Sequence, residues 1–178
     1  MDFNEVLTGR RSIRKYKEGA ITKEQIEELI KAAQAAPTWK NSQTGRFYVV
    51  LSDEKKKEFA EKCLPPFNQK NTENAAAYIV TTFVSHRSGF EKTGEPTNEL
   101  GDEWGAMDLG LQEENLVLKA YEMGFGSLIM GVRDGQAISE FFDIPEIEHV
   151  GAVISVGLSD IAPEAPKRRD LEQILKVY

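Results

Sequence analysis

Cysteine and histidine are scarce in this chain of 178 residues, and their scarcity limits the chemistry open to it. Cys63 has no second cysteine with which to form an internal disulfide, and an incidental buried thiol is a simpler role for it than a nucleophile. His86 and His149 lie far apart with no paired cysteine, so no zinc site is expected. With no secretory signal recognised, this composition favours a reducing, cytoplasmic setting.

Long apolar runs and glycine-rich phosphate loops are also missing. No apolar stretch approaches the roughly 20 residues that a membrane-spanning helix needs, so no membrane segment is expected. The chain contains neither a Walker sequence nor G-x-G-x-x-G, and Gly124–Ser127 stands between an expected helix and an expected strand, the wrong order for a dinucleotide fingerprint. The formal net charge of −7 argues against a general nucleic-acid-binding protein, which usually presents a net basic face.

The size and composition of the chain fit one domain over residues 1–178, with 40% apolar residues for a core and 29% charged residues for a surface. Helical and strand patterns are mixed without a regular βαβ alternation, which predicts an α+β fold with one sheet wrapped by helices. Parallel and antiparallel strand pairs both stay open at this level.

Local patterns predict the individual elements. A capping box at Thr22 and Gln25 starts an amphipathic helix that must end before Pro37, and Gly124 stands where a glycine stops a long helix. The other expected helices cover residues 2–8, 53–63, 103–123, 135–142 and 171–178, and the expected strands cover 46–51, 77–84, 127–132 and 150–158. Residues 86–102 carry no period and are predicted to form a lid or functional loop.

Two basic clusters stand out against the acidic total. Residues 10–15 hold four cations, and residues 167–169 hold three more near the other end. Arg10, Ser12 and Arg14 alternate, so an extended backbone would direct all three to one side. If the fold joins the two clusters, guanidinium groups and a hydroxyl would make a phosphate site. The alternative is a solvated surface whose cations pair with nearby Glu and Asp.

The segment 36–47, "APTWKNSQTGRF", is the second candidate for a binding site. It begins where Pro37 ends a helix, and its polar side chains, Thr38 and Asn41 among them, can hydrogen-bond a heteroaromatic edge or a polyol. Trp39 offers a stacking surface. An ordinary turn-rich loop explains the same composition.

Together these stretches resemble the FMN-dependent nitroreductase family. The resemblance rests on "RRSIRKY", on "AAPTWKNSQTGRFYVV", on "MGFGSLIMG" and on the late pair Lys167 and Arg169, and it extends over essentially the whole chain. It implies an α+β fold with a mostly antiparallel central sheet, assembled as an intertwined homodimer. FMN would lie at the subunit interface and touch both chains.

The resemblance also implies roles for particular residues. The FMN phosphate would meet Arg10, Arg11, Ser12, Lys167 and Arg169. Arg14 would face N1 and O2 of the flavin, where reduction places negative charge.

Further contacts are implied for the flavin ring and its ribityl chain. The backbone of Met130 and Gly131 would approach N5, and the absence of a Cβ at Gly131 suits a close approach. One residue of the 69–71 segment would meet the ribityl chain or the pyrimidine edge: Asn71, with Gln69 and Lys70 as alternatives. The segment reaching in from the partner subunit would contribute Pro37, Thr38, Trp39 and Asn41.

The implied activity is an NAD(P)H-dependent oxidoreductase working by a ping-pong scheme. NADH or NADPH would give hydride to flavin N5, and a small acceptor such as a nitroaromatic or a quinone would then take the electrons. No protein residue is expected to be catalytic, which agrees with the lack of a triad or paired-carboxylate motif. The alternatives are a specialised relative, such as a reductive dehalogenase or an enzyme that consumes its flavin, and a non-catalytic flavin-binding redox module. An anion-binding or nucleic-acid module fits poorly with the acidic charge.

The chain departs from the family pattern at three places. Thr44–Gly45 replaces a Pro-Trp pair, Met130 stands where a polar residue is common, and residues 86–102 match nothing in the pattern. Phe90 and Trp104 could line an acceptor pocket, although packing in the core or lid explains them as well.

Overall fold

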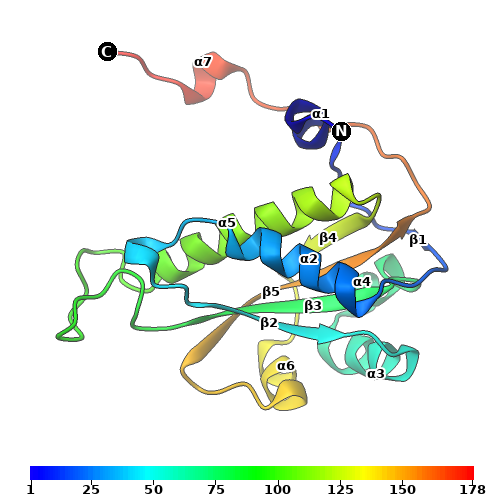
Figure 1. Ribbon diagram of the computed structural model, residues 1–178, viewed down its shortest axis with the longest axis horizontal. Helices are drawn as coiled ribbons and strands as arrows, with labels where there is room; N and C mark the ends of the chain where they lie inside the picture. Colours follow the sequence, from blue (N-terminus) through cyan, green and yellow to red (C-terminus); the bar gives the residue numbers. More distant parts are fainter.

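The computed structural model describes residues 1–178 (Figure 1). The strands are β1 (Tyr16–Lys17), β2 (Gly45–Val50), β3 (Ala77–Val84), β4 (Gly126–Met130) and β5 (Glu148–Ser159). The helices are α1 (Phe3–Gly9), α2 (Lys23–Gln34), the short 3₁₀ helix η1 (Trp39–Asn41), α3 (Asp53–Cys63), α4 (Pro66–Asn71), α5 (Glu103–Glu122), α6 (Gly135–Phe142) and α7 (Leu171–Ile174).

The five strands form one sheet in which every strand pairing is antiparallel. The order is β1-β5-β3-β2, and β4 also pairs with β5. The one parallel contact is an isolated bridge between Ser12 and Ser127. The predicted α+β fold with a mostly antiparallel sheet is therefore confirmed.

Helices cover both faces of this sheet, and the alternation of side chains along β3 shows why (Figure 1). Ala77 and Ile79 belong to one buried cluster with α2 and α5, whereas Tyr78 and Val80 belong to the other with Phe59 of α3 and α6. Successive side chains of a strand point to opposite faces, so a strand covered on both sides is apolar throughout. This explains the continuous apolar run of β3.

Cys63 lies in the second of these clusters and is fully buried. Desolvation by burial raises the pKa of its thiol to about 11. A thiol that stays protonated at neutral pH is a poor nucleophile, which agrees with the packing role expected for this residue.

The predicted helix signals are found at the expected residues. The Thr22–Gln25 capping box is formed, the Asp134 side chain accepts a hydrogen bond from the Ala137 amide, and Gly124 has φ +85° after α5. None of the helices combines the length and apolarity needed to span a bilayer.

Three features differ from the sequence predictions. α4 and β1 were not predicted, because six and two residues are too short to display a period. The terminal helix is confined to α7, whereas a helix over 171–178 was expected. Its Leu171 and Ile174 are 69% and 65% exposed, so the helix packs against nothing that would extend it. This C-terminal segment projects past α1, away from the sheet (Figure 1).

A β-bulge opposite Thr81 ties the sheet to α5, because Gly151 and Ala152 of β5 face the single residue Thr81 of β3. The β3–β5 register shifts between Val80 and Thr82, and the Thr81 hydroxyl accepts a hydrogen bond from the Ala152 amide at 3.0 Å. The same hydroxyl donates to Glu113 of α5 at 2.5 Å. Burial raises the pKa of the Glu113 carboxyl.

Glu113→Gln is expected to stabilise the protein at pH 7. A raised pKa means that the folded state holds the proton of Glu113 more tightly than the unfolded state does. The contribution of Glu113 to the stability of the fold is therefore complete below its pKa in the unfolded state, and it is lost as the pH rises through its pKa in the folded state. Gln keeps the acceptor for Thr81 and removes the desolvated charge. The thermal midpoint should rise by roughly 2–4 °C, the shift that about 1 kcal/mol produces in a chain of this size. Thermal unfolding at pH 7 and pH 4 checks this: the gain should shrink at pH 4, and a lower midpoint at pH 7 contradicts it.

Candidate functional site

The two ends of the chain meet in a cavity of about 600 Å³. The N-terminal cluster supplies Arg10, Arg11, Ser12 and Arg14, and the C-terminal segment supplies residues 163–166 and Arg168. The structure thus brings the two basic regions of the sequence to one place. Lys167 and Arg169 are not among the residues that line the cavity.

Backbone pairing with β4 sets the position of the N-terminal cluster. Ser12 bridges to Ser127, and the Ile13 amide donates to the Ser127 carbonyl oxygen at 2.9 Å. Ile13 is buried against Gly126, where a Cβ would come within 2.7 Å of the Ile13 side chain. Because Ile13 points into the core, Ser12 and Arg14 on either side of it face the cavity.

The two guanidinium groups at the start of this segment have unused donors. Arg10 Nε and Arg11 Nε are buried without a hydrogen-bond partner. The only ion pair of Arg10 is a long one of 3.9 Å to Glu114, and Arg11 otherwise donates to the backbone oxygens of Thr8 and Arg10. Leaving a buried donor unpaired costs about 1–3 kcal/mol, more for a charged group, so these donors fit an anionic ligand.

The charge of the cavity fits the same ligand. Four arginines line it, and Glu164 is the single carboxylate among its lining residues. Guanidinium groups bind phosphate oxygens through paired hydrogen bonds, and the Ser12 hydroxyl adds a neutral donor. A second cavity of about 390 Å³ shares Arg10 and Arg11 and has apolar walls that include Ile13 and Phe125. The residues present therefore suit a phosphate attached to a larger, partly apolar group.

The end of β4 offers backbone and open space. The Met130 side chain is buried in the core, so only its backbone faces the surface of the sheet edge. No heavy atom lies within 4 Å of the position that a Cβ on Gly131 would occupy. Ile129 and Val132 beside it are 41% and 62% exposed. A flat ring can approach this segment without a steric obstacle.

Helix α4 brings a polar residue to this place that the sequence reasoning missed. The Asn68 side chain is buried and donates to the Val132 carbonyl oxygen at 2.9 Å. Asn71 lies three residues later, on the same face of the helix. The Pro65–Pro66 pair marks the start of this helix, but no signal in the sequence singles out Asn68, because its partner Val132 lies 64 residues away.

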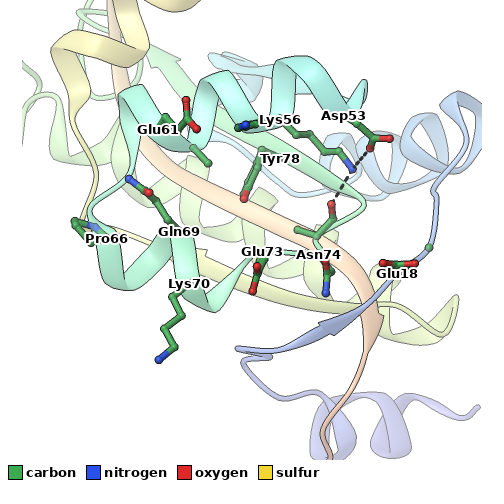
Figure 2. A pocket seen from close by; sticks show the side chains of 14 residues that line it. Glu18, Asp53, Lys56, Glu61, Pro66, Gln69, Lys70, Glu73, Asn74 and Tyr78 are labelled. Carbon is green, nitrogen blue, oxygen red and sulfur yellow. Dashed lines mark hydrogen bonds and ion pairs between the residues drawn. The ribbon is translucent and has the colours of Figure 1, made fainter.

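Gln69 and Lys70 instead line a different cavity, of about 850 Å³, between α3 and α4 (Figure 2). Carboxylates and lysines alternate around it, and Lys56 is fixed by the Ala75 carbonyl oxygen and Asp53, both at 3.0 Å. It shares no lining residue with the basic cavity. Of the three candidates in α4, Asn71 is the one that does not line this cavity.

The loop 37–43 lies at the other end of α5 from the arginines (Figure 1). The Trp39 amide bonds to Asp108 in the first half of α5, whereas Gly9 lies against Tyr121 in its last turn. Thirteen residues of helix separate these two anchors by about 20 Å, although the Arg10 side chain reaches back to Glu114, about 9 Å along the helix from Asp108. Pro37, Thr38, Trp39 and Asn41 line neither of the two cavities beside the arginines.

The packing around Gly45 explains why Thr44–Gly45 can replace the Pro-Trp pair of the family pattern. A Cβ on Gly45 would collide with the side chain of Gln112, which packs directly on its backbone. Thr44 is buried, and its hydroxyl lies 3.5 Å from the Ser88 hydroxyl of the 86–102 segment. The strand entry is thus shaped by close packing on α5 instead of by a bulky aromatic ring.

Comparisons with known proteins agree on one family. The model of the Nitroreductase family matches residues 7–158. A protein of Archaeoglobus fulgidus, provisionally named a NADH dehydrogenase/NAD(P)H nitroreductase, is 34% identical over 152 residues, covering 83% of this chain and 80% of its own. The NADPH-flavin oxidoreductase of Vibrio harveyi is 31% identical, covering 92% of this chain and 68% of its own.

A solved structure shows the same fold. It is a provisionally named nitroreductase of Exiguobacterium sibiricum in complex with FMN, which superimposes with a TM-score of 0.87 at 24% identity. The alignment covers 100% of this chain and 98% of the other.

Proposed function

Because this chain belongs to the nitroreductase family, we propose that it is an FMN-dependent oxidoreductase that moves electrons from NADH or NADPH to a small acceptor such as a nitroaromatic or a quinone. Bound FMN supplies the redox chemistry, taking a hydride at N5 and passing the electrons on in a ping-pong scheme. The work left to the protein is to bind, orient and shield this group. No protein acid or base is assigned to the reaction, and residues 1–178 act as one flavin-binding domain.

The buried Nε atoms of Arg10 and Arg11 carry this proposal, because neither has a hydrogen-bond partner and Arg10 Nε has only the long ion pair of 3.9 Å to Glu114. In the proposal, these two arginines and Ser12 hold the FMN phosphate from one side of the cavity, and the C-terminal segment closes it from the other. Arg168 is the cation of that segment that lines the cavity, and Lys167 and Arg169 stay as predicted phosphate ligands. Arg14 would place a fixed cation beside the pyrimidine edge of the ring, where reduction adds negative charge.

The other ligands in the proposal follow the edge of the sheet. The backbone of Met130 and Gly131 would approach the central ring, where the structure leaves space. Asn71 would contact the ribityl chain or the pyrimidine edge, with Asn68 beside it holding the Val132 backbone in place. These groups are neutral, so they would orient the ring, and Arg14 would stabilise the negative charge that reduction adds to it.

The remaining ligands would come from a second copy of the chain, in a homodimer. Pro37, Thr38, Trp39 and Asn41 line neither cavity beside the arginines, and in the proposal they reach the cofactor because another subunit brings its own loop there. The exposed apolar side chains of the C-terminal segment, among them Leu171, Ile174 and Leu175, support such an assembly, because a free chain gains nothing from exposing them.

The purified protein should be yellow or take up added FMN. Excess NADH or NADPH should bleach the flavin absorbance without oxygen, and menadione or a nitroaromatic should restore it. Anaerobic absorbance spectroscopy measures both half-reactions. A protein that neither carries nor takes up FMN contradicts the proposal, and a flavin that no nicotinamide nucleotide bleaches contradicts the enzymatic part of it.

Substitution of the arginines should separate their roles. Arg10→Ala should raise the Kd for FMN by about 10- to 150-fold, the equivalent of about 1.5–3 kcal/mol for a charge-assisted hydrogen bond, and Arg168→Ala should do so more than Arg169→Ala. Arg14→Ala should lower the reduction potential of bound FMN. Fluorescence titration and a dye-equilibration potential measure these, with exposed Lys57→Ala as control. Unchanged affinity in Arg10→Ala excludes the phosphate role, and an unchanged potential excludes the role of Arg14.

The C-terminal segment should be required for dimerisation. The wild type should sediment at twice its chain mass of 20.0 kDa. Leu171→Asp together with Ile174→Asp should yield a monomer with weakened FMN binding and an unchanged circular dichroism spectrum, because both side chains are exposed in the single chain. Lys57→Asp on α3 is the control. A wild-type monomer that binds FMN tightly would contradict the proposed assembly.

A further inference from the structure

A buried carboxylate on α5 joins two segments that are far apart in sequence. Asp108 is 4% exposed, and no cation is paired with it. Both of its carboxylate oxygens accept the Trp39 amide at 3.0 Å, and Oδ2 also accepts the Ser88 hydroxyl at 2.7 Å. Trp39 belongs to the loop 38–43, and Ser88 belongs to the 86–102 segment, hereafter the lid.

Other contacts between the loop and the lid surround this carboxylate. The Ser42 and Ser88 hydroxyls lie 2.6 Å apart, and because Ser88 gives its proton to Asp108, Ser42 must donate to Ser88. Lys40 pairs with Glu91 at 3.2 Å. The rings of Trp39 and Trp104, the only two tryptophans of the chain, have centroids 4.6 Å apart.

The loop needs such an anchor because its backbone is unfavourable by itself. Lys40 and Gln43 have φ values of 46° and 49°, in the left-handed region that residues other than Gly, Asn and Asp avoid, and Asn41 between them has φ 56°. Such conformations persist only where surrounding contacts hold them. Within the loop, one contact of this kind is the Gln43 amide donating to Thr38 Oγ1 at 3.1 Å. The Asp108 bonds connect this strained loop to the rigid helix.

We propose that Asp108 is a positioning residue that holds the loop and the lid as one unit, so that displacement of the lid is transmitted to the loop. This inference rests on the proposed function for its consequence: the loop of one subunit reaches the FMN of the other, and the lid borders the acceptor. An acceptor that moves Ser88 would then loosen the Trp39 anchor and alter cofactor binding. A lid that only packs on the surface would have no such effect.

Two variants break the unit at different points. Asp108→Asn replaces one carboxylate oxygen with an amide NH2, and because both oxygens accept the Trp39 N–H, this donor faces the Trp39 N–H in either orientation of the amide. Ser88→Ala removes only the bond from the lid and is the milder change if Asp108→Asn does not fold. Glu113→Gln is the matched control, since it removes a hydrogen-bonded carboxylate from the same helix without touching loop or lid.

Site-resolved tryptic cleavage of the flavin-free protein measures directly whether the loop and the lid are coupled. Lys40 reports on the loop, and Arg87 and Lys92 report on the lid. In Asp108→Asn, early cleavage should increase by about tenfold at all three sites, the equivalent of about 1.4 kcal/mol of lost protection. Ser88→Ala, a change in the lid, should also increase cleavage at Lys40. Tryptophan fluorescence should shift in both variants, because both tryptophans lie in this unit.

The Kd for FMN, measured on the dimer, tests the consequence for cofactor binding. Asp108→Asn should raise the Kd for FMN by about tenfold, and the double variant with Ser88→Ala should raise it no further, because Ser88 acts through the same carboxylate. The proposal is overturned if Ser88→Ala increases cleavage in the lid but leaves Lys40 protected. It is also overturned if Glu113→Gln changes cleavage and the Kd for FMN as much as Asp108→Asn does. If even the wild type binds no FMN, the proposed function fails, while the cleavage pattern still decides the coupling.

Discussion

The fold depends on strand β5, because every strand except β2 pairs with it. One edge of β5 holds β3, and the other edge holds β4 and then β1 at its end. A twelve-residue strand with antiparallel neighbours on both sides fixes the register of the whole sheet. It also places β4 where residues 12 and 13 can pair with Ser127, and this pairing brings the N-terminal arginines to the sheet edge.

The candidate site is built at an edge where pairing is incomplete. Beyond the Ser12 bridge, β4 has β5 on one side only, and its last residues lead into the open space at Gly131. Helices α2 and α5 keep the rest of the sheet dry, so the polar backbone and the charged side chains meet only along this edge. The cations that would bind a phosphate and the flat surface that would accept a ring therefore lie next to each other, because both are at the open edge of β4.

Helix α5 connects the two halves of the proposed site. Its last turn packs on Gly9 and its middle holds Glu114 beside Arg10, whereas its first half carries Asp108 and Gln112 against the loop and the strand entry. A helix is stiff over its length, so it keeps the two anchors at Asp108 and Tyr121 about 20 Å apart. One chain thus presents two partial sites at two ends, and a homodimer would pair each with the complementary part of the other subunit.

Local sequence signals determined most of the elements. Caps at Thr22 and Asp134, the glycine at 124 and the apolar run of β3 each act within a few residues, so helix ends and strands could be located from the sequence. The order of the motifs was also enough to suggest the family. The elements that were missed, β1 and α4, are too short for a pattern, and the terminal helix was overextended because its apolar face has nothing to pack on.

The site itself was decided by tertiary structure. Which cation of the C-terminal cluster lines the cavity depends on the path of a segment without regular structure, and the structure gives Arg168 where the family resemblance implied Lys167 and Arg169. Asn68 and Asp108 became visible only once Val132 and Trp39 were seen beside them, 64 and 69 residues away. Composition and periodicity report on near neighbours, whereas hydrogen bonds across such separations exist only after the chain has folded.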